Sequence, residues 1–131
     1  MLKHIKRLGS AELEIMQILW SADGPVTSTW IHDKLMSSRT WPLSTLMTSL
    51  SRLADKGFVH CDRSTRSNLY SALVSENAYR QDEGASFLSR VYGNSLQNFV
   101  ASLYDARAIT KDDIAVLRAY LDELERKSDD Q

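Results

Sequence analysis

Residues 42–59 read PLSTLMTSLSRLADKGFV, which predicts a helix running into a strand. One side of this helix is apolar and carries Leu43, Leu46, Leu50, Leu53 and Ala54. The other side carries short hydroxyl side chains and one arginine: Ser44, Thr45, Thr48, Ser51 and Arg52. Serine and threonine are mediocre helix formers, because their side chains compete for backbone hydrogen bonds. An exposed helical face built from them therefore needs a reason.

Insertion into the major groove of DNA is one such reason. Bulky side chains on this face would hold the helix axis away from the bases, whereas short hydroxyls let the helix enter the groove. Ser44, Thr45 and Thr48 can then contact base edges or phosphates, and a threonine methyl can touch a thymine methyl. Arg52, two turns further along, can reach the backbone or a guanine. For the helix taken alone, a solvated Ser/Thr-rich surface explains the pattern equally well.

The segments before this helix strengthen the DNA-binding interpretation. Ser10 is a plausible N-cap for a helix through Trp20, and Glu12 and Glu14 sit favourably in its first turn. The stretch SADGP breaks that helix, Val26 can form a very short strand, and Thr27 or Ser28 can cap a second helix over 28–37. The third helix, over 43–56, is stopped by Gly57.

Two alternating segments after the third helix predict a β-hairpin. Residues 58–62 and 68–73 have the pattern of strands and flank the polar loop RSTRS. Three helices followed by a hairpin are the winged helix-turn-helix arrangement, in which the hairpin is the wing. Arg63 and Arg66 lie at its tip and can contact phosphates or the minor groove. The alternative for this tip is a merely soluble turn.

The second part of the chain is predicted to be helical, over 76–91, 95–106 and from Thr110 onward. Thr110 and Asp113 form a variant capping box at the start of the last helix. Apolar residues at helical spacing predict a dimerisation surface: Leu96, Phe99, Leu103, Ile114, Leu117, Leu121 and Leu124. The alternative is that these residues pack back onto the winged helix in one monomeric core.

The expected fold is therefore mainly α with a small β-hairpin wing. Residues 1–74 form the winged helix-turn-helix domain, and residues 75–131 form a helical dimerisation domain. Charge separates the two parts, since residues 1–73 hold nine Lys/Arg against six Asp/Glu, whereas residues 74–131 hold seven against eleven. The formal net charge of −1 gives no whole-chain argument for nucleic-acid binding.

The remaining sequence features favour a soluble cytoplasmic protein without a catalytic site or cofactor. Cys61 is the only cysteine, so no intrachain disulfide can form. No signal peptide, membrane-spanning segment or known enzyme motif is recognisable. His60 and Cys61 are adjacent on a strand and should point to opposite faces, which makes them poor metal co-ligands. His32 is expected at the edge of the core.

The three tryptophans are expected in different surroundings. Trp20 is predicted in the core, and Trp41 is predicted to support the start of the third helix. Trp30 is placed on the outer side of the second helix, where it could contact an effector or a partner.

Four stretches resemble the penicillinase-repressor family of bacterial winged-helix repressors (the BlaI/MecI/CopY type). They are SAELEIMQILW at 10–20, TWPLSTLMTSLSRLADKGFV at 40–59, the wing ending in Tyr70, and SFLSRVYGNSLQNFVASL at 86–103 with the ITKDDIAVLRAYLDEL helix. The resemblance implies a repressor that binds double-stranded operator DNA as a homodimer at a dyad. It also implies Thr45 and Thr48 as base-reading residues and Arg66 as the wing contact.

Departures from the family pattern concern specificity and induction. Ser44 and Met47 replace residues that are often basic or long and polar, so the operator is expected to differ. Thr65 and Asn68 replace the wing's usual glycine and aromatic residue. Ser102–Leu103 aligns with the Asn–Phe bond that is cleaved in the β-lactam branch, and the Cys-x-Cys motifs of the copper-responsive branch are absent. The resemblance therefore leaves open whether a sensor protease or another inducing component acts on this chain.

The expected function is that of a bacterial transcriptional repressor. It would bind its operator through the third helix in the major groove and through the wing. The alternative is a winged-helix protein-interaction module that does not bind DNA, for which the low net positive charge is the best support.

Overall fold

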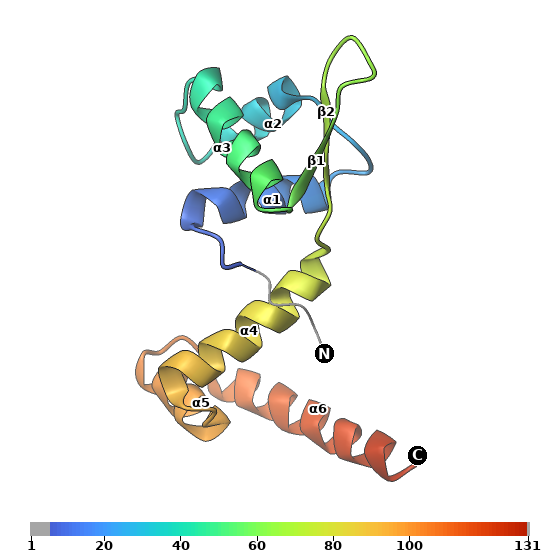
Figure 1. The fold of residues 1–131 in the computed structure, drawn as a ribbon. Coiled ribbons are helices and arrows are strands. Elements are labelled where there is room, and N and C mark those ends of the chain that lie inside the picture. Colours follow the sequence, from blue (N-terminus) through green and yellow to red (C-terminus); the bar gives the residue numbers. More distant parts are fainter. Residues whose placement is uncertain (1–5, 131) are drawn as a thin grey trace. The chain divides into compact units, whose positions relative to one another are not determined.

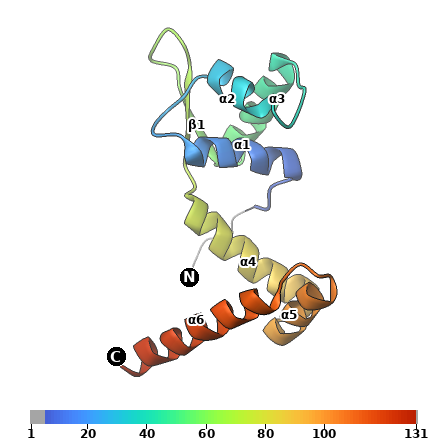
Figure 2. The ribbon, with the colours of Figure 1, turned by 180° about the vertical axis from the view of Figure 1, so that it is seen from behind.

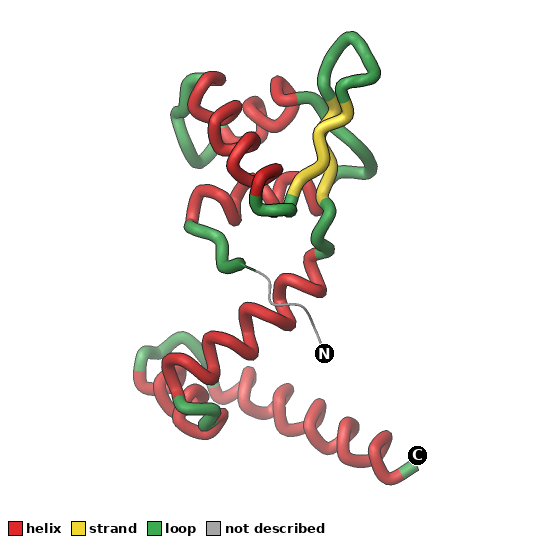
Figure 3. Tube along the Cα trace, in the orientation of Figure 1, coloured by secondary structure: helices red, strands yellow, loops and turns green. Residues whose placement is uncertain are grey.

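The computed structural model describes residues 6–130 and divides into two compact units, one ending at Gly84 and the next beginning at Ala85. Helices dominate both, and two short strands form the only sheet in the described part (Figure 3). The elements in chain order are α1 (Ser10–Ser21), α2 (Ser28–Leu35), α3 (Leu43–Asp55), β1 (Val59–Asp62), β2 (Leu69–Ala72), α4 (Glu76–Tyr92), α5 (Leu96–Asp105) and α6 (Lys111–Asp129). This order confirms the predicted mainly α fold with a hairpin wing.

The core of the first unit is built from one face of each of its helices. α1 contributes Ile15, Met16 and Leu19, α2 contributes Ile31 and Leu35, and α3 contributes Leu46, Leu50 and Leu53. The predicted apolar side of α3 is buried, except that Leu43 in its first turn is 42% exposed. Leu13, Ile18 and Trp20 of α1 pack at the margin of the core, so Trp20 is partly buried where the sequence predicted a core residue.

Helix α1 begins with a different cap from the one predicted. Ser10 is the first helical residue and Gly9 is the N-cap, with the Glu12 side chain accepting a hydrogen bond from Gly9 N–H at 3.2 Å. The Ser10 hydroxyl instead accepts a hydrogen bond from Arg39 Nη2 at 3.2 Å, so it is not available to cap the helix.

The start of α4 belongs to the first unit. Tyr79 is buried among the core residues, and its hydroxyl accepts a hydrogen bond from Leu8 N–H at 3.1 Å. The Trp20 indole N–H donates to the Val74 carbonyl at 2.8 Å and holds the segment before α4 against α1. The sequence-based boundary lies between residues 74 and 75, at the turn before α4, whereas the compact units divide within this helix.

The wing is an antiparallel hairpin extended by one short bridge. Cys61 pairs with Tyr70 in the β1–β2 register, and Val26 exchanges two backbone hydrogen bonds with Tyr70, of 3.0 and 2.7 Å. The predicted very short strand at Val26 is confirmed. Gly57 has a φ of 85°, and Phe58 N–H donates to the Leu53 carbonyl, so the chain leaves α3 directly into the hairpin.

One prediction about an individual residue of this unit needs correction. Trp30 does not point outward, because it is partly buried against the core and Lys34 lies over its ring at 5.2 Å. On β1, His60 is exposed and Cys61 beside it is half-buried, which agrees with the expectation that the two side chains point to opposite faces. His32 does lie at the core edge, where its Nε2 donates to the Trp41 carbonyl at 2.6 Å.

The second unit has well-formed helices but little buried surface. Thr110 and Asp113 form the predicted capping box of α6, with bonds of 2.8 and 3.1 Å. Gly93 and Asn94 interrupt the helices with φ values of 56° and 66°. The rings of Phe87, Tyr92 and Phe99 pack together with centroids 5.1–5.9 Å apart.

Candidate nucleic-acid interface

The two faces of α3 differ sharply in exposure. Leu46, Leu50 and Leu53 are fully buried, and they fix the helix against the other helices of the first unit. Ser44, Thr45, Thr48 and Arg52 are all exposed on the outer side. The buried leucines therefore set the rotation of α3 and turn its hydroxyl-rich face to solvent.

Thr48 is already engaged within the helix. Its hydroxyl donates to the backbone carbonyl of Ser44 at 3.1 Å, one turn earlier. The hydrogen of this hydroxyl is thus used locally, while the oxygen lone pairs and the methyl group stay free for a ligand. In this rotamer the side chain can accept a hydrogen bond from a base amino group or contact a thymine methyl.

The wing tip is organised by an acidic residue. Asp62 Oδ1 accepts hydrogen bonds from the Ser64 hydroxyl at 2.6 Å and from the Ser64 N–H at 2.9 Å. These two bonds hold the pKa of the Asp62 carboxyl below its usual value. Arg63 and Arg66 lie on this ordered turn, and both side chains are exposed.

The start of α3 and the tip of the wing both lie on the side of the first unit away from α1. In Figures 1 and 2 they stand at separate edges of that side, and α1 lies at the other side of the unit. A groove separates α3 from the hairpin and is lined from both, with Met47 and Ser51 on the helix and Arg63 and Asn68 on the wing. Of the polar residues that the sequence places on the outer side of α3 and at the wing tip, Ser51 and Arg63 line this groove.

Arg52 lies toward the opposite end of α3. It stands in the last turn of α3, and its positive charge contributes, as the smallest of several causes, to the lowered pKa of Glu12 at the start of α1. Partial burial acts to raise the pKa of Glu12, but hydrogen bonds from Lys56 and Gly9 N–H, together with the Lys56 and Arg52 charges, leave it below the usual value. A contact with the DNA backbone suits this position better than a base contact.

Two basic residues of the first unit form ion pairs with acidic residues of α1. Lys56 at the end of α3 pairs with Glu12 at 2.8 Å, and Arg39 pairs with Glu14. No ion pair involving Arg52, Arg63 or Arg66 occurs within residues 6–130. The cations that the sequence assigns to α3 and the wing are therefore among those of the first unit that form no ion pair in the described chain.

The predicted dimerisation residues are largely exposed. Leu96, Leu117, Leu121 and Leu124 are 55, 39, 44 and 42% exposed, while Phe99, Leu103 and Ile114 are half-buried. No residue of α5 or α6 is fully buried within the chain. The helices of the second unit therefore do not cover these side chains among themselves.

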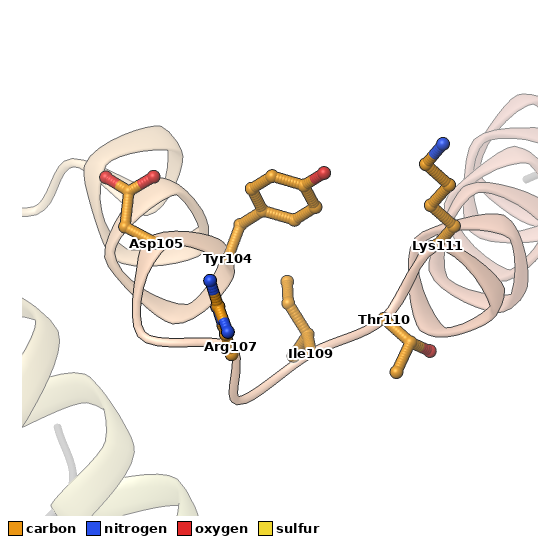
Figure 4. A pocket seen from close by; sticks show the side chains of 6 residues that line it. All are labelled: Tyr104, Asp105, Arg107, Ile109, Thr110 and Lys111. Carbon is orange, nitrogen blue, oxygen red and sulfur yellow. The ribbon is translucent and has the colours of Figure 1, made fainter.

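The turn between α5 and α6 forms a shallow hollow. It is lined by Tyr104, Asp105, Arg107, Ile109, Thr110 and Lys111. Figure 4 shows Tyr104 and Lys111 reaching to the same side of the turn, whereas Thr110 points away. This lining mixes charges of both signs and carries none of the side-chain sets used for nucleophilic catalysis.

Within residues 6–130, no group of three His, Cys, Asp or Glu side chains could hold a metal ion. None of the helices in the same range is long and apolar enough to cross a membrane.

Comparison with known proteins gives a consistent assignment. The family model "Penicillinase repressor" matches residues 8–123. The penicillinase repressor of Bacillus licheniformis is 29% identical over 122 residues, which cover 93% of this chain and 94% of that protein. The methicillin resistance regulatory protein MecI of Staphylococcus aureus (strain N315) is 25% identical, over 87% of this chain and 92% of that one.

A solved structure agrees with the sequence matches. The solution structure of the Bacillus licheniformis BlaI monomeric form in complex with the blaP half-operator superposes with a TM-score of 0.51. It is 28% identical and covers 60% of this chain and 94% of that chain. The family model spans nearly the whole chain, including both compact units, and the chain belongs to the penicillinase repressor family.

Proposed function

We propose that the chain is a cytoplasmic transcriptional repressor that binds a dyad operator as a homodimer. Each protomer would place α3 in the major groove and the wing on the adjacent backbone. Ser44, Thr45 and Thr48 would contact bases or nearby phosphates, and Arg52, Arg63 and Arg66 would contact the sugar–phosphate backbone. Membership of a family of repressors makes DNA-binding repression the expected activity.

One observation carries this proposal. The exposed hydroxyl-rich face of α3 and the exposed Arg63 and Arg66 of the wing tip belong to the same unit, and a groove lined by Ser51 of the helix and Arg63 of the wing lies between the two elements. Short polar side chains flanked by cations suit a duplex, because the helix can approach the bases while the cations neutralise phosphates. In the structural relative, the protein is described in complex with a half-operator.

The exposed apolar residues of α5 and α6 support the homodimer. A seam with Leu117, Leu121 and Leu124 about 40% exposed is unfavourable in water unless a second surface covers it. A two-fold dimer buries the same seam on both protomers and presents two α3 helices to successive major grooves, about 34 Å apart.

Induction is proposed not to depend on cleavage between Ser102 and Leu103. This bond lies inside α5, where the Ala106 N–H donates to the Ser102 carbonyl at 2.9 Å. Cleavage there requires local unfolding of the helix, whereas an Asn–Phe pair stands four residues earlier in the same helix, at Asn98–Phe99. A sensor protease acting at another bond of the chain, or another inducing component, would be required.

A salt titration tests the repressor function directly. The operator would first be selected from genomic fragments bound by the purified full-length chain at low salt. Affinity for that operator should fall by at least about 10³-fold between ~50 and ~200 mM salt, because a dimer contacting several phosphates releases their counterions. Uniformly weak binding to every fragment at low salt would favour the interaction-module alternative.

A further inference from the structure

A second concave site lies on the first unit, between α1 and the beginning of α4. The hollow has a volume of about 290 Å³, near the lower limit of ordinary small-molecule pockets. Its lining includes Leu13 and Trp20 from α1 and four residues of α4: Glu76, Tyr79, Arg80 and Glu83. None of these residues belongs to the surface that carries α3 and the wing.

Two aromatic side chains line the hollow, of which Trp20 is partly buried and Tyr79 is buried with 6% of its surface exposed. The rings of Trp20 and Tyr79 lie 5.9 Å apart and are tilted by 38°. Their polar atoms are bonded to backbone groups, since the Trp20 indole N–H donates to Val74 and the Tyr79 hydroxyl accepts from Leu8. The ring surfaces are consequently suited to an apolar group or to a cation held over an aromatic face.

The charges around the hollow do not cancel. Arg80 pairs with Glu76 at 3.1 Å, one turn earlier on α4. Glu83 is half-buried at the same hollow and has no ion-pair partner among residues 6–130. The lining therefore combines two aromatic rings with one uncompensated carboxylate.

We propose that this hollow binds a small organic cation with an aromatic or branched apolar body. The apolar body would pack against Leu13, Trp20 and Tyr79, and the positive group would face the carboxylate of Glu83. An anion of the same size would meet the surplus negative charge and is disfavoured. The volume restricts the ligand to roughly a substituted single ring.

Titration of the ¹⁵N-labelled full-length chain with benzyltrimethylammonium ion tests the site without DNA. The Trp20 indole N–H and the Gly84 N–H, at the edge of the hollow, should shift in the NMR spectrum. The Trp30 and Trp41 indole signals, assigned by replacing each tryptophan with phenylalanine, serve as internal controls. Phenylacetate, an anion of similar size, should produce shifts at least 3-fold weaker at equal concentration.

Charge-matched variants show whether Glu83 is responsible. Glu83→Gln should weaken benzyltrimethylammonium binding about 3- to 5-fold, which corresponds to the strength of an exposed ion pair. Glu125→Gln removes the same charge from an exposed position on α6 and should leave the affinity unchanged. Equal losses in both variants, or equal shifts with phenylacetate, would overturn the proposal. Signals that change when the protein is diluted, but not when the cation is added, would also overturn the proposal. They would show that this face is a contact between two copies of the chain.

Discussion

At the scale of the residue, Thr48 has two groups left for recognition. Its hydroxyl hydrogen is bonded to the Ser44 carbonyl, so the oxygen can only accept a further bond, and the methyl group is free for an apolar contact. Thr48→Ala removes both groups and should lower discrimination between operator and mismatched sites by about 1 kcal/mol per protomer. Fluorescence anisotropy with the selected operator and single-base variants measures this difference.

Two conservative variants separate those contributions. Thr48→Val keeps a branched side chain with methyl groups but removes the acceptor, and Thr48→Ser keeps the acceptor but removes the methyl. If a thymine methyl is read, Ser should behave like Ala, while Val should retain discrimination. If the hydroxyl oxygen accepts from a base, the order should reverse. Full discrimination in all three variants would exclude Thr48 as a reader.

The residue that orders the wing tip gives a pH prediction. Hydrogen bonds from Ser64 lower the pKa of Asp62, so the bonded turn favours the carboxylate form. This stabilisation is complete above the ordinary carboxyl pKa of about 4 and is lost as the pH falls through the lowered pKa. The Ser64 amide signal, followed by NMR from pH 7 to pH 2, should therefore titrate with a midpoint below that value.

Asp62→Asn is the control for the pH prediction. An amide oxygen can still accept from Ser64, but it does not titrate in this range. The Ser64 amide of the variant should consequently lose its acidic transition. A wild-type midpoint at or above the ordinary carboxyl pKa would show that the two bonds do not favour the charged form.

At the scale of the element, the sequence predicted helices best where an apolar stripe and a cap agreed. In α3 the leucine spacing fixed the buried face, and Gly57 fixed the end. In α1 the assignment of Ser10 as the N-cap was wrong, because its hydroxyl pairs with Arg39, which is 29 residues away in sequence. Trp30 was misplaced for a similar reason, since tertiary packing and Lys34 cover a ring that local periodicity put outside.

The wing as an element should add affinity without adding sequence preference. Arg66 is exposed at the tip, where a guanidinium can meet phosphate. Arg66→Ala should weaken binding to operator and to random duplex by the same factor, and it should reduce the salt slope by about 1 per protomer. Anisotropy titrations at several salt concentrations measure both quantities.

Arg126→Ala is a matched control for the wing prediction. It removes an exposed arginine from the last turn of α6, outside the first unit. Its salt slope should equal that of the unaltered chain. A selective loss of operator binding in Arg66→Ala, with random duplex unaffected, would instead make Arg66 a base-reading residue.

At the scale of the whole molecule, the sequence predicted two groups of helices, those of the winged helix-turn-helix domain and those of the dimerisation domain. The first unit buries an apolar core from α1, α2 and α3, whereas the apolar stripes of α5 and α6 have helical periodicity and contain no fully buried residue. Helical periodicity of apolar residues predicts that one face of a helix is buried, but it does not predict whether the surface that buries it belongs to the same chain. The chain alone therefore leaves the second unit incomplete, and a second copy supplies the missing surface in the proposed dimer.

Leu117→Asp tests that dimer. A carboxylate in the middle of the seam would be buried without a partner, so the variant should sediment as a monomer and bind the full operator at least 10-fold more weakly. Val116→Asp adds the same charge to the neighbouring position, which is 70% exposed and lies outside the 114–117–121–124 spacing, and should remain dimeric. Circular dichroism establishes that both variants keep their helices. If the Leu117→Asp protein still sediments as a dimer, the two-fold contact lies on another surface. If it is a monomer with undiminished operator affinity, each α3 binds DNA independently.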